Sequence, residues 1–253
     1  MVSTESLASL HKRILDAKRD YDPPWPLLGL VDDAYRRYVL EEGDTCYYQW
    51  LAILVRFLKP RLVLELGSYL GVSTIMMYSE LAQYSQLVSC DIASNLAFIP
   101  QIMRADPRVS FVEGNDLNLS VYGERLPLGI DILFIDTAHE FDQITAEWEI
   151  YKYLCRPGAI VVLDDIELNG MSEFWASLEY PKVEISKDCH LSGFGMFRYE
   201  PGTEPNSEHA YRASLKIAYS SLERHSEILA PSNSRTRRIE ALRSALRRCH
   251  GTG

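Results

Sequence analysis

A short turn built on two glycines, between an apolar run and a helix, constrains the fold of this chain most. The run Leu62–Leu66 is apolar apart from Glu65, and Gly67 and Gly71 follow it. Such a run is typical of a strand covered on both faces of a sheet, and glycine lets the backbone turn tightly and approach a ligand. The helix expected over residues 72–81 would point its free N–H groups at the turn. The segment therefore predicts a strand–turn–helix unit that binds a ligand.

The acidic residue before the turn indicates which ligand binds there. The carboxylate of Glu65 would repel phosphate but attract an ammonium group or a ribose hydroxyl, which favours an aminoacyl nucleoside. The spacing also lacks the third glycine of a dinucleotide fingerprint. The pattern Glu-x-Gly-x-x-x-Gly resembles motif I of the class I S-adenosylmethionine (SAM) dependent methyltransferases. This resemblance implies that SAM contacts Glu65, Gly67, Ser68, Tyr69, Gly71 and Ser73. A purely structural strand–turn–helix is the alternative.

Length and composition indicate one sizeable core in a soluble protein. The chain has 253 residues, of which 47% are hydrophobic and 24% charged. No apolar stretch approaches the ~20 residues that span a bilayer, and residues 1–20 do not have the continuous apolar core of a secretory signal. The five cysteines are dispersed and form no Cys-x-x-Cys pair. We therefore expect reduced thiols in a cytoplasmic protein, with no membrane span and no thiolate metal site.

The charge distribution argues against nucleic acid as a partner. The net charge is −9, and residues 201–253 carry 9 Lys/Arg against 5 Asp/Glu, which leaves −13 on residues 1–200. An acidic body binds a phosphate backbone poorly. A basic amphipathic helix is expected at 235–248, with Ile239, Leu242 and Leu246 on one stripe. A packed or dimerising tail is favoured over a site for an anionic partner, so a homo-oligomer is one expectation.

Strand and helix patterns alternate along most of the chain and predict the fold class. Helices are expected at 4–19, 31–40, 46–58, 208–229 and 235–248, and strands at 61–66, 86–90, 109–113, 130–135 and 159–163, with a pairing hairpin at 182–186 and 195–199. The alternation implies right-handed crossovers and a parallel sheet. We expect an α/β, Rossmann-like, seven-stranded and mostly parallel sheet with helices on both faces, an antiparallel edge hairpin, and helical additions at both termini. Residues 1–58 would form a helical lid and the first core helix, 59–200 the SAM-binding core, and 201–253 a helical extension.

Acidic side chains follow all five expected parallel strands. The strand-end residues are Glu65, Asp91, Asn115-Asp116, Asp136 and Asp164-Asp165. Ligands of open parallel sheets bind at this edge. Asp91 is placed to accept the ribose hydroxyls, because it lies about 20 residues beyond the glycine turn. Asn115 and Asp116 could hydrogen-bond the adenine amino group or serve as turn residues or a helix N-cap.

The acids that follow the fourth and fifth strands predict a metal site. Asp136, Asp164 and Asp165, here named the acid trio, come from neighbouring strand ends. Three carboxylates that close would raise one another's pKa values unless a cation lay between them. Oxygen ligands of this kind suit a hard divalent cation such as Mg²⁺. Asp136 is also expected to face the cofactor.

This second pattern resembles the metal-dependent O-methyltransferases, the group that includes catechol and macrolide-sugar O-methyltransferases. The similarity spans about Gly43 to Tyr199 and rests on the glycine turn and on Phe134-Ile135-Asp136. It implies that the acid trio holds Mg²⁺ and that His139, three residues after Asp136, is the catalytic base. An imidazole of pKa near ~6.5 suits that role. The implied reaction is methylation of a small-molecule hydroxyl, such as that of a sugar or natural product.

Three other functions stay open on the sequence. The first is a metal-independent methyltransferase acting on nitrogen or carbon, with structural acids. The second is a non-catalytic SAM-binding module that uses its basic tail for contacts. A nicotinamide dehydrogenase is the least favoured, because of the glycine spacing and Glu65.

Overall fold

The computed structural model describes residues 5–30, 47–93, 96–125, 127 and 129–201. The helices expected at 31–40, 208–229 and 235–248 lie outside the described residues, as does most of the predicted C-terminal extension. The described part of the chain contains the glycine turn, every expected strand and all the predicted site residues.

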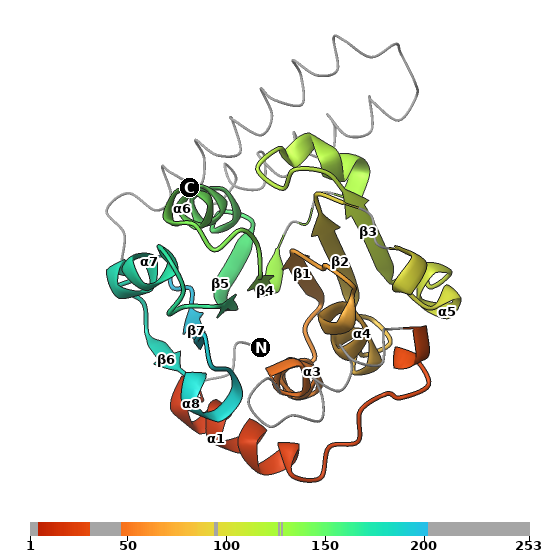
Figure 1. Ribbon diagram of the computed structural model, residues 1–253, viewed down its shortest axis with the longest axis horizontal. Helices are drawn as coiled ribbons and strands as arrows, with labels where there is room; N and C mark the ends of the chain where they lie inside the picture. Colours follow the sequence, from red (N-terminus) through yellow and green to blue (C-terminus); the bar gives the residue numbers. More distant parts are fainter. Residues whose placement is uncertain (1–4, 31–46, 94–95, 126, 128, 202–253) are drawn as a thin grey trace, which may run out of the picture.

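Seven strands form one mixed sheet, as the sequence predicts. They are β1 (Leu62–Leu66), β2 (Gln86–Asp91), β3 (Val109–Glu113), β4 (Ile130–Ile135), β5 (Cys155–Asp164), β6 (Lys182–Glu184) and β7 (Phe194–Arg198). Their order across the sheet is β3-β2-β1-β4-β5-β7-β6, visible in Figure 1. The first five strands are parallel, and β7 pairs antiparallel with both β5 and β6. The predicted antiparallel edge is therefore confirmed.

The strand register brings the acidic strand ends to one edge. Leu66 pairs with Cys90 and with Ile135, and Ile135 pairs with Leu163. These aligned residues come immediately before the glycine turn, Asp91, Asp136 and Asp164. Because parallel strands end on the same side, the turn and the acids meet there.

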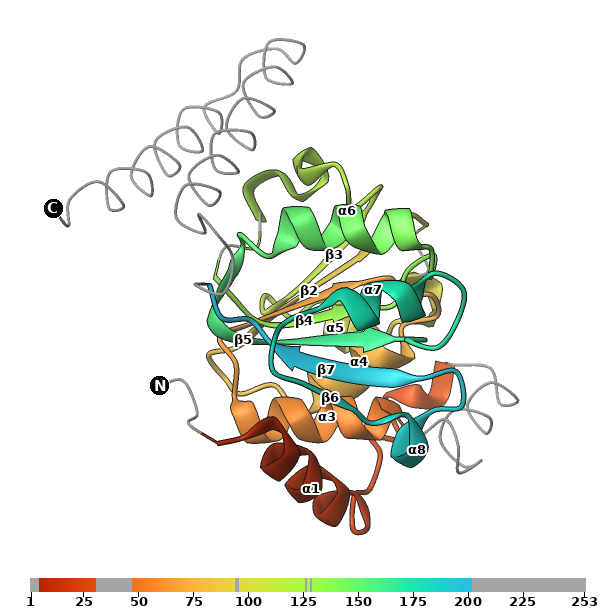
Figure 2. The same cartoon turned by 90° about the vertical axis from the view of Figure 1, so that its left-hand side faces the viewer.

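Helices cover both faces of the sheet, as Figure 2 shows. The helices α1 (Leu7–Lys18), α3 (Tyr47–Leu58) and α4 (Val72–Ser79) lie on one face, and α6 (Phe141–Tyr151) and α7 (Met171–Ser177) on the other. Alternation along the strands supplies a core to each layer. In β4, Ile132 and Phe134 pack towards α3, whereas Leu133 and Ile135 pack with Trp148 of α6.

The N-terminal helix α1 packs on α3 and so belongs to the same layer. Ser6 caps it by accepting a hydrogen bond from the backbone N–H of Ser9. Its buried His11 accepts a hydrogen bond from the indole of Trp50 at 3.1 Å. Shorter elements complete the described chain: η1 (Leu28–Leu30), η2 (Leu96–Phe98), α5 (Gln101–Arg104), η3 (Leu119–Arg125) and α8 (Ser186–Cys189).

The structure bears on two sequence expectations, the absence of a membrane span and the reduced state of the cysteines. None of the described helices is both long and apolar enough to cross a bilayer. Cys90 and Cys155 are buried free thiols. Burial raises the pKa of Cys90 to about 11, so this thiol is protonated near neutral pH and is a poor nucleophile.

Candidate active site

The glycine turn requires glycine at both ends. Gly67 has φ +82°, and a Cβ there would lie 1.7 Å from the carbonyl oxygen of Asp136. Gly71 has φ +79°, and a Cβ there would lie 2.1 Å from Cδ1 of Ile99. Gly67 thus lets the end of β1 lie directly against the end of β4. This close approach joins the turn to the first member of the acid trio.

Glu65 does not lie where the sequence analysis expected it. Its side chain is fully buried and accepts hydrogen bonds from Ser73, Thr74 and Ser89. Side chains alternate along a strand, so Glu65 shares the face of Val63 and points beneath α4 rather than out of the sheet edge. Burial raises the pKa of Glu65 to about 7, although the three hydroxyl groups lower it in part. Glu65 and Ser73 therefore anchor the first turn of α4, and neither lines the two cavities at this edge of the sheet.

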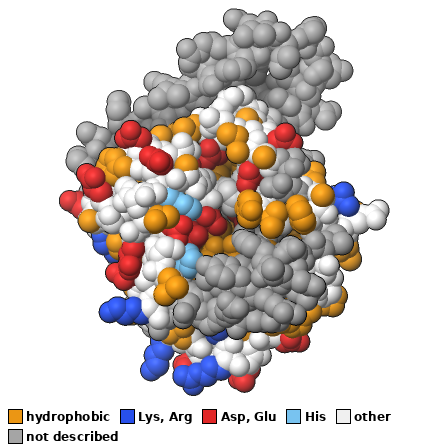
Figure 3. All heavy atoms as spheres, viewed as in Figure 1, with side chains coloured by type: hydrophobic (Ala, Val, Ile, Leu, Met, Phe, Trp, Pro, Cys, Tyr) orange, Lys and Arg blue, Asp and Glu red, His pale blue; other side chains and the backbone are white. Residues whose placement is uncertain are grey.

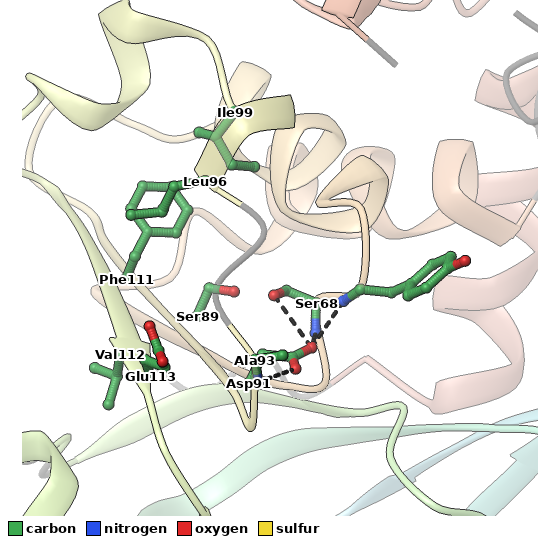
Figure 4. Close-up of a pocket in the computed structure, with 10 residues that line it drawn as sticks. Ser68, Ser89, Asp91, Ala93, Leu96, Ile99, Phe111, Val112 and Glu113 are labelled. Atoms are coloured by element: carbon green, nitrogen blue, oxygen red, sulfur yellow. Dashed lines mark hydrogen bonds between the residues drawn. The ribbon is translucent and has the colours of Figure 1, made fainter. Parts of the chain in front are cut away.

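Asp91 binds the backbone of the glycine turn. Its Oδ2 accepts hydrogen bonds from the N–H groups of Ser68 and Tyr69, both at 2.8 Å, and its Oδ1 accepts one from Ala93 at 3.0 Å. Figure 4 shows these bonds converging on the carboxylate. Each carboxylate oxygen has two lone pairs, so Oδ1 retains acceptor capacity.

Two neighbouring cavities meet at Asp91. The smaller one, about 210 Å³, lies between the ends of β2 and β3, with Leu96, Ile99 and Phe111 on its apolar side. Glu113, at the end of β3, lines it as well (Figure 4). Glu113 was not among the predicted site residues, although it is an acid at the end of an expected strand; in the sheet it pairs with Asp91.

The larger cavity, about 690 Å³, holds most of the predicted site residues. Its lining includes Tyr47, Tyr48, Gly67, Ser68, Tyr69, Val72, Cys90, Asp91, Ile92, Gly114, Asn115, Asp116, Asp136, Thr137, Ala138, Gln143, Asp164, Asp165, His190 and Ser192. The lining joins the glycine turn to the acid trio. On the face seen in Figure 3, acidic and histidine side chains gather beside one another next to a hollow.

Asn115 and Asp116 both lie at this cavity, in a turn after β3. Asn115 Oδ1 and Asp116 Oδ1 each accept a hydrogen bond from the N–H of Leu117. This is the turn-residue role that the sequence analysis left open for them. The other oxygen of Asp116, Oδ2, is buried and accepts no hydrogen bond from the described residues.

Asp116 and Glu147 form a buried carboxyl pair, and Glu147 was not among the predicted site residues. Glu147 of α6 is fully buried and accepts hydrogen bonds from Gln143 at 2.6 Å and Thr137 at 3.1 Å. Burial, reinforced by the charge of Asp116, raises the pKa of Glu147 to about 8. Gln143 and Thr137 face the cavity and connect it to this pair.

The acid trio converges around His139, as the strand register implies. Nε2 of His139 lies 3.3 Å from Oδ1 of Asp136, and its Nδ1 lies 3.3 Å from Oδ2 of Asp165. Ligand atoms of Asp136, His139 and Asp164 all lie within 4.8 Å of one another. Oδ1 of Asp164 is buried without a hydrogen-bond partner among the described residues, as is Oδ1 of Asp165.

The electrostatics of the acid trio reflect this crowding. Burial raises the pKa of Asp164 well above its usual range, and the charges of Asp136 and Asp165 raise it further. Burial also acts to raise the pKa of Asp165, but His190, Ser192 and His139 lower it by a larger amount. For His139, burial lowers the pKa, and the hydrogen bond to Asp136 together with both neighbouring carboxylates raises it overall. A divalent cation would suit such a set of oxygens.

A second histidine joins the acid trio from a segment that no sequence pattern indicated. Nε2 of His190, just after α8, lies 3.3 Å from Oδ1 of Asp164 and 3.1 Å from Oδ1 of Asp165. Ligand atoms of Asp164, Asp165 and His190 also lie within 4.8 Å of one another. His190 packs against the ring of Tyr47, with centroids 4.7 Å apart.

Strained backbone concentrates at the same place. Five described residues other than glycine have positive φ, and Tyr69, His139 and Asp165 are three of them, at +42°, +55° and +53°. Such conformations cost about 1–3 kcal/mol each and persist where the surroundings enforce them, often at functional sites. The two cavities, the crowded acids and the strained backbone therefore mark one site.

Comparisons with known proteins find the same fold in solved methyltransferase structures. Residues 64–166 match the family model of a methyltransferase domain. Among curated proteins, none matches this chain. The O-methyltransferase from Bacillus cereus, solved in complex with SAH, is 19% identical with a TM-score of 0.54, and the match covers 79% of this chain and 100% of that one. A methyltransferase from Geobacter sulfurreducens is 16% identical with a TM-score of 0.55, and the match covers 74% and 96% of the two chains. The SAH-bound methyltransferase PaMTH1 from Podospora anserina is 16% identical with a TM-score of 0.50, and the match covers 78% and 91%.

Proposed function

We propose that this chain, a SAM-dependent methyltransferase by its fold and its methyltransferase domain, methylates a hydroxyl oxygen of a small molecule. The acid trio would hold Mg²⁺ or another hard divalent cation beside the cofactor. A hydroxyl of a sugar or another natural product is the acceptor class we favour. The observation that carries the proposal is that the acid trio lines the same cavity as the glycine turn, while His139 contacts two members of the trio from outside the cavity lining.

Several side chains would hold SAM across the two cavities. Asp91 lines both cavities, and the remaining acceptor capacity of its carboxylate suits the ribose hydroxyls. Asn115 and Asp116 line the larger cavity, and a side-chain oxygen of either residue suits an amino group such as that of adenine. Ser68 and Tyr69 line both cavities and complete the contacts along the glycine turn.

The carboxylates of the acid trio repel one another, and a cation between them would remove that repulsion. Oδ1 of Asp164 and Oδ1 of Asp165 are buried without hydrogen bonds from described residues, and leaving such oxygens unpaired is costly. When bound, the cation supplies positive charge that lowers the pKa of an adjacent hydroxyl, and SAM supplies the methyl group.

His139 would act as the general base. Its ring lies beside the acid trio, and contacts with Asp136 and Asp165 hold the orientation of both nitrogens. It would accept the hydroxyl proton as the oxygen attacks the methyl carbon. Much of the rate enhancement would come from the residues that hold the hydroxyl oxygen in line with the methyl carbon and the sulfonium.

One observation favours a metal-independent reaction. His139 and His190, if protonated, could neutralise part of the acid trio without any ion.

Chelation separates the metal-dependent function from the metal-independent one. Methyl transfer from SAM to a panel of hydroxylated sugars and phenols should stop after EDTA treatment and removal of the chelator, and should return when Mg²⁺ or Mn²⁺ is added. Full activity after chelation, or methylation of amines alone, would contradict the proposal.

A further inference from the structure

We propose that Nε2 of His190 is a further ligand of the cation held by the acid trio, so that the site has mixed nitrogen and oxygen donors. This inference rests on the cation site of the proposed function. It concerns a residue that the site pattern in the sequence does not include.

The distances around His190 are those of neighbouring metal ligands. Its Nε2 lies 3.3 Å from Oδ1 of Asp164 and 3.1 Å from Oδ1 of Asp165. Two ligands at right angles around an ion with bonds of about 2.1 Å lie about 3 Å apart. The spacing therefore leaves room for one ion in contact with all three atoms.

A simple ion pair of His190 with Asp164 and Asp165 explains these contacts less well than a shared cation does. Neither Oδ1 of Asp164 nor Oδ1 of Asp165 accepts a hydrogen bond from a described residue, although both lie close to the imidazole. Nδ1 of His190 is also buried without a described hydrogen-bond partner, and a charged N–H there would be costly. A neutral ring avoids a buried positive charge, and its Nε2 lone pair and the carboxylates would then face a shared cation, while the Nδ1–H stays without a described acceptor.

The fold holds His190 firmly in this position. Its backbone N–H donates to the carbonyl oxygen of Ser186 at 2.9 Å, and its ring packs against Tyr47. The hydroxyl of Ser192 lies 3.2 Å from Nε2 and lines the same cavity. Because β7 lies next to β5 in the sheet, the loop before β7 brings His190 to the end of β5.

A nitrogen ligand alters which ion the site prefers. Mg²⁺ selects oxygen donors, whereas imidazole strengthens binding of transition-metal ions such as Mn²⁺ and Co²⁺. The wild-type protein should therefore bind Mn²⁺ more tightly than Mg²⁺. The ratio of the two affinities should fall when the nitrogen is replaced by an amide oxygen.

Electron paramagnetic resonance of bound Mn²⁺ tests this ligand directly. Full-length wild type, His139→Gln, His190→Gln and the double variant would each be titrated with Mn²⁺, and nitrogen coupling to the ion would be recorded by electron spin-echo modulation. We expect nitrogen coupling in wild type and in His139→Gln. We also expect its loss in the double variant, and an Mn²⁺ affinity at least about tenfold lower in His190→Gln.

The outcomes separate this inference from the proposed function. Wild-type protein that binds no Mn²⁺ would overturn the cation site itself. Mn²⁺ that binds with no nitrogen coupling in His139→Gln, or a His190→Gln variant that binds Mn²⁺ as tightly as wild type, would overturn only the role of His190. If His190→Gln does not fold, as judged by circular dichroism, the His139→Gln protein labelled with ¹⁵N-histidine still reports a histidine ligand through its changed coupling.

Discussion

At the scale of single residues, the candidate site depends on side chains whose roles differ although their chemistry is the same. Glu65, Asp91 and Asp164 all end or follow parallel strands. Glu65 is buried under α4, Asp91 binds the backbone of the glycine turn, and Asp164 faces other carboxylates. The neighbours of each carboxylate therefore differ, although all three groups lie at the same edge of the sheet.

The proposed base gives the first prediction. His139→Ala should lower kcat by about 10²–10⁴-fold, because the hydroxyl proton then lacks an acceptor. SAM binding should stay near the wild-type affinity, because His139 contacts Asp136 and Asp165 and is not one of the side chains proposed to hold SAM. Steady-state kinetics together with calorimetric titration of SAM would test both statements. Unchanged turnover would remove His139 from the mechanism.

The acid trio gives a prediction on pH. Binding of a cation requires ionised carboxylates, and burial holds the pKa of Asp164 well above its usual range. Mn²⁺ affinity should therefore rise with pH, as Asp164 loses its proton. Titrations at several pH values, followed by the resonance of free Mn²⁺, measure this. An affinity that is constant with pH would show that no buried acid competes for protons at the site.

At the scale of elements, the glycine turn and the strand ends determine the site. The positions of the strands and of the glycine turn could be predicted from the sequence, because strand patterns and turn glycines are local signals. The seven strands lie where these patterns placed them. Two features were not predicted. The face on which Glu65 lies follows from the alternation within β1, which the sequence analysis did not apply to this residue. The position of His190 depends on β7 lying between β5 and β6, which only the assembled sheet reveals.

The packing of the glycine turn against β4 gives a prediction on stability. Gly67→Ala should destabilise the fold by more than about 2 kcal/mol, because it combines a positive φ with a clash at the carbonyl of Asp136. Gly29→Ala is the matched control, since a Cβ there meets nothing within 4 Å, and it should change stability by less than about 0.5 kcal/mol. Urea denaturation measures both. Equal stability of the two variants would contradict the close approach seen at Gly67.

At the scale of the whole molecule, buried acids link stability to pH. Burial and Asp116 raise the pKa of Glu147 to about 8, from a usual value of 4.5. The folded protein therefore binds a proton that the unfolded chain has lost above about pH 4.5. This contribution to stability is present at low pH and is lost as the pH rises towards 8.

The corresponding prediction compares two glutamates, one at the start of α6 and one within it. Glu147→Gln should flatten the fall in melting temperature between about pH 5 and 8, because the amide resembles the protonated acid. Glu140→Gln, at the exposed N-cap of the same helix, should leave the pH dependence as in wild type. Differential scanning fluorimetry across that range measures both. A slope that Glu147→Gln leaves unchanged would place the proton on another group.

Calorimetric titration of Mg²⁺ into chelator-treated protein saturated with S-adenosylhomocysteine tests the central claim most directly. The account predicts that one ion binds each wild-type chain, and that Asp164→Asn, which removes a buried charge from the acid trio, abolishes this binding. Wild-type protein that takes up no ion, or a variant that binds as well as wild type, would contradict it.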